Sequence, residues 1–204
     1  MLGDEKLLML DLAIPRDHAL FLDDVTQSYR WIGDVWAATL RDLGLEAYAL
    51  PVNEARADTQ TLNPLLKSVC FGGLSPFETM VGRRKIVGLA QFRRRAGALF
   101  QCGVYLRWNP QHTAALIPFS MPDRAALAEQ LRTRVGGLDE LLNRQVSPTE
   151  VMESFDAALE RLTGLVPIDD DWNPDERTTR SATTDNYAAI DLTPTLHTEG
   201  DAGV

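Results

Sequence analysis

Cys70 and Lys85 are the two residues whose side chains could together support covalent chemistry. Cys70 lies in a short apolar stretch and precedes Gly72 and Gly73, where a backbone can lie close to a ligand. A thiol becomes a nucleophile near neutral pH when a nearby positive charge lowers its pKa from about 8.5. Lys85 is the best candidate for that charge if the strands that carry the two residues pair. A buried, inert cysteine is the simpler alternative, because free cysteines are among the most buried residues.

The residues after Lys85 indicate a slot for an apolar ligand. Strand alternation would place Lys85, Val87, Leu89 and Gln91 on one face and Ile86, Gly88 and Ala90 on the other. Two small residues on one face leave room for an extended acyl chain, and an ammonium at the start of the strand could hold a carboxylate, phosphate or thioester oxygen. The alternative is a solvated hairpin lysine beside a glycine bulge.

Other kinds of site have little support. His18, His112 and His197 are scattered, so no metal site is predicted. No serine sits in a Gly-x-Ser-x-Gly elbow, and no Gly-x-x-x-x-Gly-Lys phosphate loop is present. One short basic cluster without an aromatic-rich motif does not predict nucleic-acid binding. Its six cations are Arg83, Arg84, Lys85, Arg93, Arg94 and Arg95.

The elements that must position these residues follow from hydrophobic spacing and from capping signals. Asp24 caps a helix that ends at Gly44, and Ser147 caps another that ends at Gly164. A further helix spans 123–135, and residues 53–64 are polar enough for a surface loop. Strands are expected at 7–14, 45–52, 69–71, 77–81, 85–91 and 98–106, the last three as a meander with basic turns. The fold class is therefore α/β (α+β): a mixed, largely antiparallel sheet flanked by helices.

Length and charge suggest one domain followed by a tail. The chain has 204 residues, 45% of them hydrophobic, and a net charge of -9. Residues 166–204 hold nine acids and two arginines, so most of the negative charge lies there. We expect a domain over 1–165 and an acidic, disordered tail over 166–204. No apolar run is long enough to span a membrane and no signal peptide is recognisable, so a cytoplasmic protein without membrane contact is expected.

Several motifs occur in a characteristic order. They are Val69-Cys70-Phe71, Ser75-Pro76-Phe77-Glu78, the stretch from Gly82 to Gln91, and Leu99-Phe100-Gln101-Cys102-Gly103. In this combination the chain resembles the biotin/lipoate protein ligase superfamily, specifically lipoate–protein ligases and cysteine octanoyltransferases. The resemblance covers roughly residues 7–106, with looser similarity to about 165, and implies a lipoate ligase-like catalytic domain.

The resemblance implies an acyltransferase of lipoate metabolism. One octanoyltransferase branch uses a cysteine fifteen residues before a lysine, the separation of Cys70 and Lys85. By this likeness Cys70 would be the acyl-accepting nucleophile and Lys85 the cation that lowers its pKa. The donor would be an acyl carrier protein, and the acceptor a lysine on a lipoyl domain of a 2-oxoacid dehydrogenase or on the glycine cleavage H protein. The implied substrate-binding residues are Gly72, Gly73, Gly88, Ala90, Gln91, Gln101 and Gly103.

Two alternatives remain. In an ATP-dependent lipoate–protein ligase, ATP and Mg would be required and Cys70 would only pack, whereas octanoyl transfer needs no cofactor. Relatives also carry an Arg-Arg-x-Thr/Ser-Gly-Gly motif upstream of the first predicted strand, and this sequence contains none. An N-terminally truncated domain is therefore expected: an inactive fragment, or a non-catalytic subunit that a second chain completes.

Overall fold

The computed structural model describes residues 6–118 and 120–183. The chain divides into two units, one up to Pro167 and one from Ile168, and each is described by itself. In the part of the chain that is described, no helix is both long and apolar enough to cross a membrane.

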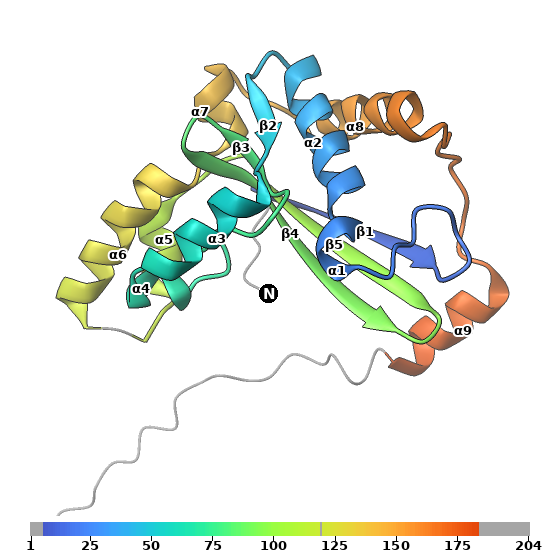
Figure 1. The fold of residues 1–204 in the computed structure, drawn as a ribbon, viewed down its shortest axis with the longest axis horizontal. Helices are drawn as coiled ribbons and strands as arrows, with labels where there is room; N and C mark the ends of the chain where they lie inside the picture. Colours follow the sequence, from blue (N-terminus) through green and yellow to red (C-terminus); the bar gives the residue numbers. More distant parts are fainter. Residues whose placement is uncertain (1–5, 119, 184–204) are drawn as a thin grey trace, which may run out of the picture. The chain divides into compact units, whose positions relative to one another are not determined.

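A five-stranded sheet forms the centre of the first unit, in the order β1-β5-β4-β3-β2 (Figure 1). The strands are β1 (Leu7–Pro15), β2 (Ala47–Ala49), β3 (Thr79–Val81), β4 (Arg84–Arg94) and β5 (Gly97–Tyr105). All four strand pairings are antiparallel, and one isolated parallel bridge joins Lys85 to Val135. The predicted fold class and the meander of β3, β4 and β5 are confirmed.

Helices cover the sheet on both sides (Figure 1). On one face α2 and α8 enclose the main core, in which Trp36, Phe100 and Phe155 are almost completely buried. The other face carries a second apolar cluster built from α4, α5 and α6. The helices of this unit are α1 (Val25–Ser28), α2 (Arg30–Asp42), α3 (Val52–Thr61), α4 (Pro64–Lys67), α5 (Pro110–Ala115), α6 (Met121–Arg134), α7 (Leu138–Leu142) and α8 (Pro148–Thr163).

The capping signals set the outer helix boundaries as predicted, although the first predicted helix is divided at Tyr29 into α1 and α2. The Asp24 side chain accepts a hydrogen bond from the Gln27 N–H, and Gly44 ends the helical region with a φ of 99°. Ser147 caps α8 in the same way, and Gly164 ends it at a φ of 75°. These caps lie within the chain's local sequence, which is why they could be recognised without knowledge of the tertiary structure.

The predicted loop over 53–64 is wrong, because most of it forms helix α3. Only Ala55 of this helix is buried, and the polar side chains around it face solvent. Polarity here reflects exposure of the helix rather than irregular backbone.

The predicted strand over 69–71 is also wrong. Asn63 caps the short helix α4, and two backbone turns follow it, from Val69 N–H to Leu66 O and from Gly72 N–H to Val69 O. The turns use the backbone groups that a strand would need for pairing. Cys70 therefore lies in a loop.

A β-bulge corrects the predicted faces of β4. Met80 pairs with Lys85 while Thr79 pairs with Val87, so Ile86 is an extra residue in the strand. The extra residue shifts the alternation. Lys85 lies on the same side as Gly88, where both contact Phe71, and not on the side of Val87 and Leu89, as strict alternation predicted.

The second unit contains helix α9 (Pro174–Thr183), in which all side chains up to Ala182 are exposed. This helix differs from the disorder predicted for the acidic tail. Residues 184–204, on which the rest of that prediction falls, lie outside the described residues.

Candidate active site

A cavity of about 500 Å³ lies between the sheet and the loop that carries Cys70. The sheet contributes its floor through β1, β4 and β5, while α5 and the segment before it close one side. Its lining is mostly apolar, and none of the described residues that line it is a lysine or an arginine. The lining residues are Leu7, Met9, Ser68, Val69, Cys70, Phe71, Glu78, Gly88, Leu89, Ala90, Gln101, Gly103, Tyr105, Trp108, Thr113 and Ile117.

The two cysteines have opposite surroundings. Cys70 is exposed and lines the cavity. Cys102 is completely buried in β5, and burial raises the pKa of its thiol to about 12. Because the thiolate is the reactive form of cysteine, Cys70 is the thiol available for chemistry.

Phe71 packs over two glycines that are paired across β4 and β5. Gly88 lies opposite Gly103 in the strand register, and a Cβ atom added at Gly88 would stand 2.9 Å from Phe71 Cζ. The ring also contacts Tyr105, which stacks in turn against Trp108. Glycines are required at this pair because any side chain would displace the aromatic wall of the cavity.

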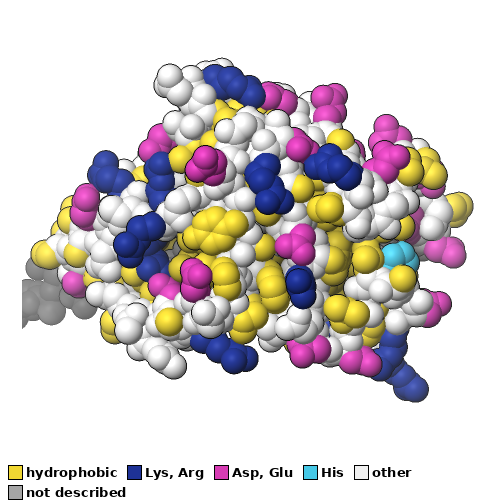
Figure 2. All heavy atoms as spheres, turned by 45° about the horizontal axis from the view of Figure 1, so that its top comes forward, with side chains coloured by type: hydrophobic (Ala, Val, Ile, Leu, Met, Phe, Trp, Pro, Cys, Tyr) yellow, Lys and Arg dark blue, Asp and Glu magenta, His cyan; other side chains and the backbone are white. Residues whose placement is uncertain are grey.

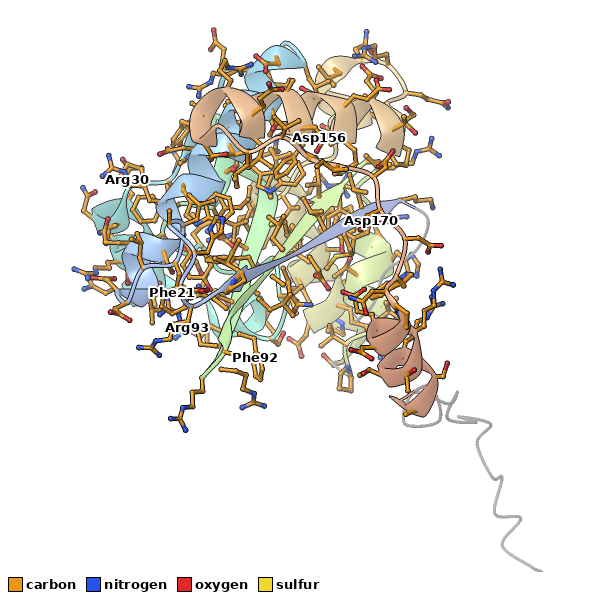
Figure 3. All side chains as sticks on the ribbon, turned by 90° about the vertical axis from the view of Figure 1, so that its right-hand side faces the viewer. Phe21, Arg30, Phe92, Arg93, Asp156 and Asp170 are labelled. Carbon is orange, nitrogen blue, oxygen red and sulfur yellow. The ribbon has the colours of Figure 1, made fainter. Side chains whose placement is uncertain are left out.

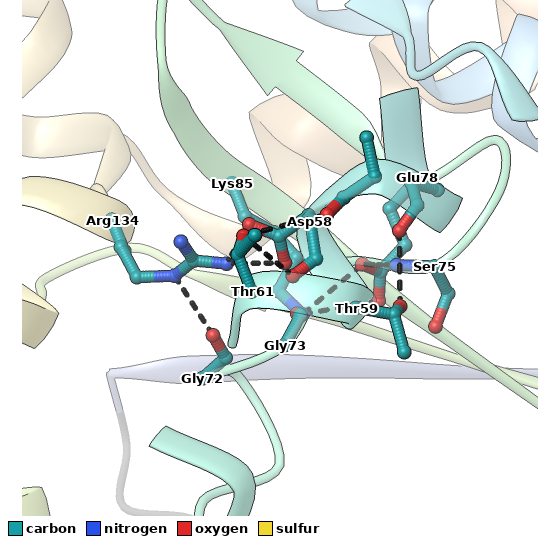
Figure 4. Close-up of polar contacts among 11 residues, drawn as sticks. Asp58, Thr59, Thr61, Gly72, Gly73, Ser75, Glu78, Lys85 and Arg134 are labelled. Carbon is teal, nitrogen blue, oxygen red and sulfur yellow. Dashed lines mark hydrogen bonds and ion pairs between the residues drawn. The ribbon is translucent and has the colours of Figure 1, made fainter. Parts of the chain in front are cut away.

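Lys85 is buried in an ion pair with Glu78, which lines the cavity. Its Nζ lies 3.1 Å from Glu78 Oε2 and 2.5 Å from the Gly73 carbonyl oxygen, to which it donates a hydrogen bond (Figure 4). It also lies 5.1 Å from the centroid of the Phe71 ring. Glu78 accepts further hydrogen bonds from the Ser75 and Leu89 N–H groups, so the buried carboxylate is well satisfied.

The environment of Lys85 has two opposing effects on its pKa. Burial lowers the pKa below its ordinary value of 10.5, and the Glu78 carboxylate partly offsets this effect by favouring the ammonium form. The ammonium has polar contacts to Glu78 and Gly73, and Cys70 is not among them. The predicted effect of Lys85 on the Cys70 pKa therefore stays a prediction.

The structure brings together five of the nine predicted site residues. Cys70, Gly88, Ala90, Gln101 and Gly103 all line the cavity. The other four do not line it. Gly72 and Gly73 lie in the loop after Cys70, and their carbonyls accept hydrogen bonds from Arg134 and Lys85.

Gln91 lies in a separate network at the end of the β4–β5 hairpin. Its side chain contacts Ser28 Oγ and accepts a hydrogen bond from Arg93 Nε. Arg93 also donates to the Leu22 and Asp23 carbonyls and packs on Phe21. Figure 3 shows Arg93 and Phe21 close together. This part of the basic cluster therefore fastens the hairpin to the segment before α1.

Sequence reasoning missed Glu78, the partner of Lys85. A lysine within an apolar strand needs an acid nearby, and Glu78 stands directly before the neighbouring strand. That pairing rule could have identified it. Phe71 could also have been inferred, because the space over two facing glycines must be filled.

The described residues give no indication of a metal or nucleic-acid site. Among them, no group of three or more His, Cys, Asp or Glu side chains is placed to hold a metal ion. On the face shown in Figure 2, basic and acidic side chains are interspersed around apolar ones. A continuous basic stripe of the kind that follows a phosphate backbone is not seen on that face.

Solved structures show the same fold. The bi-partite lipoate protein ligase of Thermoplasma acidophilum aligns with a TM-score of 0.67 at 18% identity, and the alignment covers 89% of this chain and 61% of that one.

Curated relatives are similar in sequence. The octanoyltransferase LipM of Bacillus subtilis (strain 168) is 28% identical over 167 residues, which are 81% of this chain and 58% of the relative. LipM of Anoxybacillus flavithermus (strain DSM 21510 / WK1) is 30% identical over 166 residues, with 79% and 58% covered. The chain thus spans less than two thirds of these relatives. Residues 3–160 match the lipoyl protein ligase A/B catalytic domain, and the chain belongs to that family.

Proposed function

We propose that this chain transfers an octanoyl group through a thioester on Cys70. The observation that carries the proposal is an exposed thiol at the edge of an apolar cavity of about 500 Å³, a size typical of small-molecule sites. The similarity to LipM octanoyltransferases supports the same chemistry. The donor in this proposal is an octanoyl–acyl carrier protein, and the acceptor is a lysine on a lipoyl domain.

The reaction proceeds in two balanced steps. The Cys70 thiolate attacks the carbonyl carbon of the donor thioester, a new C–S bond forms, and the carrier leaves as a thiolate that takes a proton from solvent. The neutral amine of the acceptor lysine then attacks the octanoyl–Cys70 thioester. An amide bond forms, the amine releases a proton to solvent, and Cys70 leaves as a thiolate, ready for another cycle.

The lining of the cavity favours this route over ATP-dependent ligation. The phosphates of a nucleoside triphosphate are bound by cationic side chains or by several backbone N–H groups. The described residues that line the cavity include no lysine or arginine. The donor thioester and the thioester on Cys70 have similar free energies, so the exchange between them requires neither ATP nor Mg. Lys85 supports the site in this proposal through the ion pair with Glu78 and through the Gly73 carbonyl. A cytoplasmic location and a second chain that completes the enzyme stay predictions.

Octanoyl transfer onto the protein tests the proposal. The chain is incubated with octanoyl–acyl carrier protein, and the modified residue is located by peptide mass spectrometry. We expect octanoyl on Cys70, its loss in Cys70→Ala, and its retention in Cys102→Ala, the matched control. Activity that requires ATP and survives Cys70→Ala would instead identify a ligase. A folded chain that forms no adduct on Cys70 contradicts the transferase.

A further inference from the structure

The loop from Ser68 to Glu78 carries Cys70 and contains neither helix nor strand. Its far end is bonded to the residue after β2, through Phe77 N–H to Leu50 O and Leu50 N–H to Glu78 O. Close to Cys70 the described backbone bonds are the two turns given above, and none of them reaches the sheet. The position of the thiol therefore depends on these turns and on side chains from other elements.

Arg134, the last residue of α6, contacts this loop directly. Its Nε donates a hydrogen bond of 2.8 Å to the Gly72 carbonyl, two residues after Cys70 (Figure 4). Its Nη2 donates to both carboxylate oxygens of Asp58 in α3, at 2.8 Å and 2.7 Å. The planar guanidinium can make these contacts together because its donors point in fixed directions.

The next carbonyl of the loop is held in a similar way. Gly73 O accepts the hydrogen bond from Lys85 Nζ, and Lys85 is paired with Glu78. Two consecutive carbonyls thus bind two cations, and each cation has its own carboxylate. The side chains of Arg134 and Asp58 are only 22% and 16% exposed, so solvent screens their pairing less than it screens surface pairs.

These contacts constrain the backbone close to the thiol. Because a peptide unit is planar, fixing the Gly72 and Gly73 carbonyls fixes the orientation of the two peptide units that follow Gly72 and Gly73. On the other side of the loop, Gly72 packs so closely on Leu66 that an added Cβ would stand 2.0 Å from the Leu66 carbonyl oxygen. The segment after Cys70 is therefore held between α4 and Arg134.

We propose that Arg134 is a positioning residue for acyl transfer, which it supports by holding the Cys70 loop, with Asp58 orienting its guanidinium. This inference rests on the proposed transferase function. Arg134 does not line the cavity, so its removal changes the placement of the loop that carries Cys70 and leaves the part of the lining on β1, β4 and β5 in place. The rate of the chemical step then falls while the binding of the donor is largely unchanged.

Hydrogen exchange tests the structural part of the inference without any substrate. We compare the chain with Arg134→Met, Asp58→Asn and the matched control Arg132→Met, whose exposed side chain pairs, among the described residues, with Glu129 on the same helix. Amides of residues 68–75 are expected to exchange about tenfold faster in the first two variants, because a charge-assisted hydrogen bond is lost. The control keeps the exchange rate of the unmodified chain.

Acylation kinetics test the functional part. In Arg134→Met the maximal rate of octanoyl transfer to Cys70 is expected to fall about tenfold, with half-saturation by octanoyl–acyl carrier protein within about twofold of the unmodified value. Arg134→Lys recovers part of the rate, since one ammonium can reach the Gly72 carbonyl or Asp58 but lacks the planar fork. Alkylation of the buried Cys102 by iodoacetamide would report global unfolding of a variant, and we expect no alkylation of Cys102 in either Arg134 variant.

The outcomes separate this inference from the proposed function. Unchanged loop exchange in Arg134→Met overturns the inference whether or not the chain is active. Unchanged acylation in Arg134→Met, beside an unmodified chain that acylates Cys70, overturns it as well. Faster loop exchange together with an unmodified chain that does not acylate Cys70 overturns the transferase and, with it, the role of Arg134 in acyl transfer.

Discussion

Cys102 and Cys70 lie in two regions that hold the backbone by different means. Cys102 is in the middle of β5, opposite Leu10 of β1 and Leu89 of β4, so strands flank it on both sides. Cys70 is in a loop whose fixed points are side chains that belong to α6 and β4. The first region owes its position to a repeated backbone pattern, and the second to a few ion-paired contacts.

This difference indicates where single substitutions should matter most. A ladder of backbone hydrogen bonds tolerates the loss of one side chain, because the remaining bonds keep the strands in register. A loop held by two cations loses a large part of its support when one of them is removed. The loop that carries Cys70 is therefore expected to be the more sensitive region, although fewer of its residues are buried.

The largest expected effect comes from breaking the buried pair of Lys85 and Glu78. Lys85→Met leaves the Glu78 carboxylate buried without its cation, which should lower the free energy of unfolding by about 3–5 kcal/mol. Urea denaturation measures the loss. The double variant Lys85→Met/Glu78→Gln should recover part of it, since no uncompensated charge remains. Equal stability of Lys85→Met and the unmodified chain would show that the pair does not support the loop.

A smaller effect is expected for Cys102 at alkaline pH. The folded thiol keeps its proton up to a pKa of about 12, whereas the thiol of the unfolded chain releases it near 9.0. The contribution of Cys102 to stability is therefore complete below pH 9 and is lost as the pH rises towards 12. By pH 11 the loss amounts to about 3 kcal/mol. Urea midpoints measured in reductant should fall less steeply with pH in Cys102→Ala, and parallel profiles would contradict this burial effect.

The glycine pair under Phe71 should respond next. In Gly88→Ala the new methyl group meets the Phe71 ring at 2.9 Å, and the ring must move towards the cavity at a cost of about 1 kcal/mol. Gly103→Ala is the matched comparison, because its Cβ would stand 3.3 Å from the same ring atom and should cost less. Octanoyl transfer rates should follow the same order. If Gly88→Ala transferred octanoyl faster than the unmodified chain, the acyl chain would not lie over Gly88.

The smallest effect is expected on the surface of the helical layer. Arg161 pairs with Asp42 between α8 and α2, and both side chains are about half exposed. Arg161→Ala should lower the free energy of unfolding by less than about 1 kcal/mol, and added salt should reduce the difference further. Octanoyl transfer should not change. A loss of stability as large as that in Lys85→Met would contradict the difference in sensitivity between the Cys70 loop and the rest of the fold.

Much of the fold could be predicted because its signals are local. The caps at Asp24 and Ser147 and the glycines at 44 and 164 act within a few residues of their partners, and they mark the helices correctly. Helix α3 was missed because polar composition fits an exposed helix as well as a loop. The bulge at Ile86 was missed because strand alternation contains no signal for one extra residue.

The candidate site was only partly predictable for the same physical reason. Cys70, Gly88 and Gly103 have side chains whose chemistry or small size is visible in the sequence. Asp58 and Arg134 are 76 positions apart, and each looks like an ordinary charge on an exposed helix. Only the tertiary fold brings them to the Cys70 loop.

Because of the bulge at Ile86, the number of residues in β4 determines on which face of the sheet the Lys85 ammonium lies. If one more residue were inserted between Ile86 and Gly88, the two-residue alternation would shift by one position, and the ammonium of Lys85 and the open space over Gly88 would lie on opposite surfaces of the sheet. The chain could then keep every residue implicated in acyl transfer and still lose the arrangement that unites them. A one-residue change in length would do more harm here than many changes in side-chain identity.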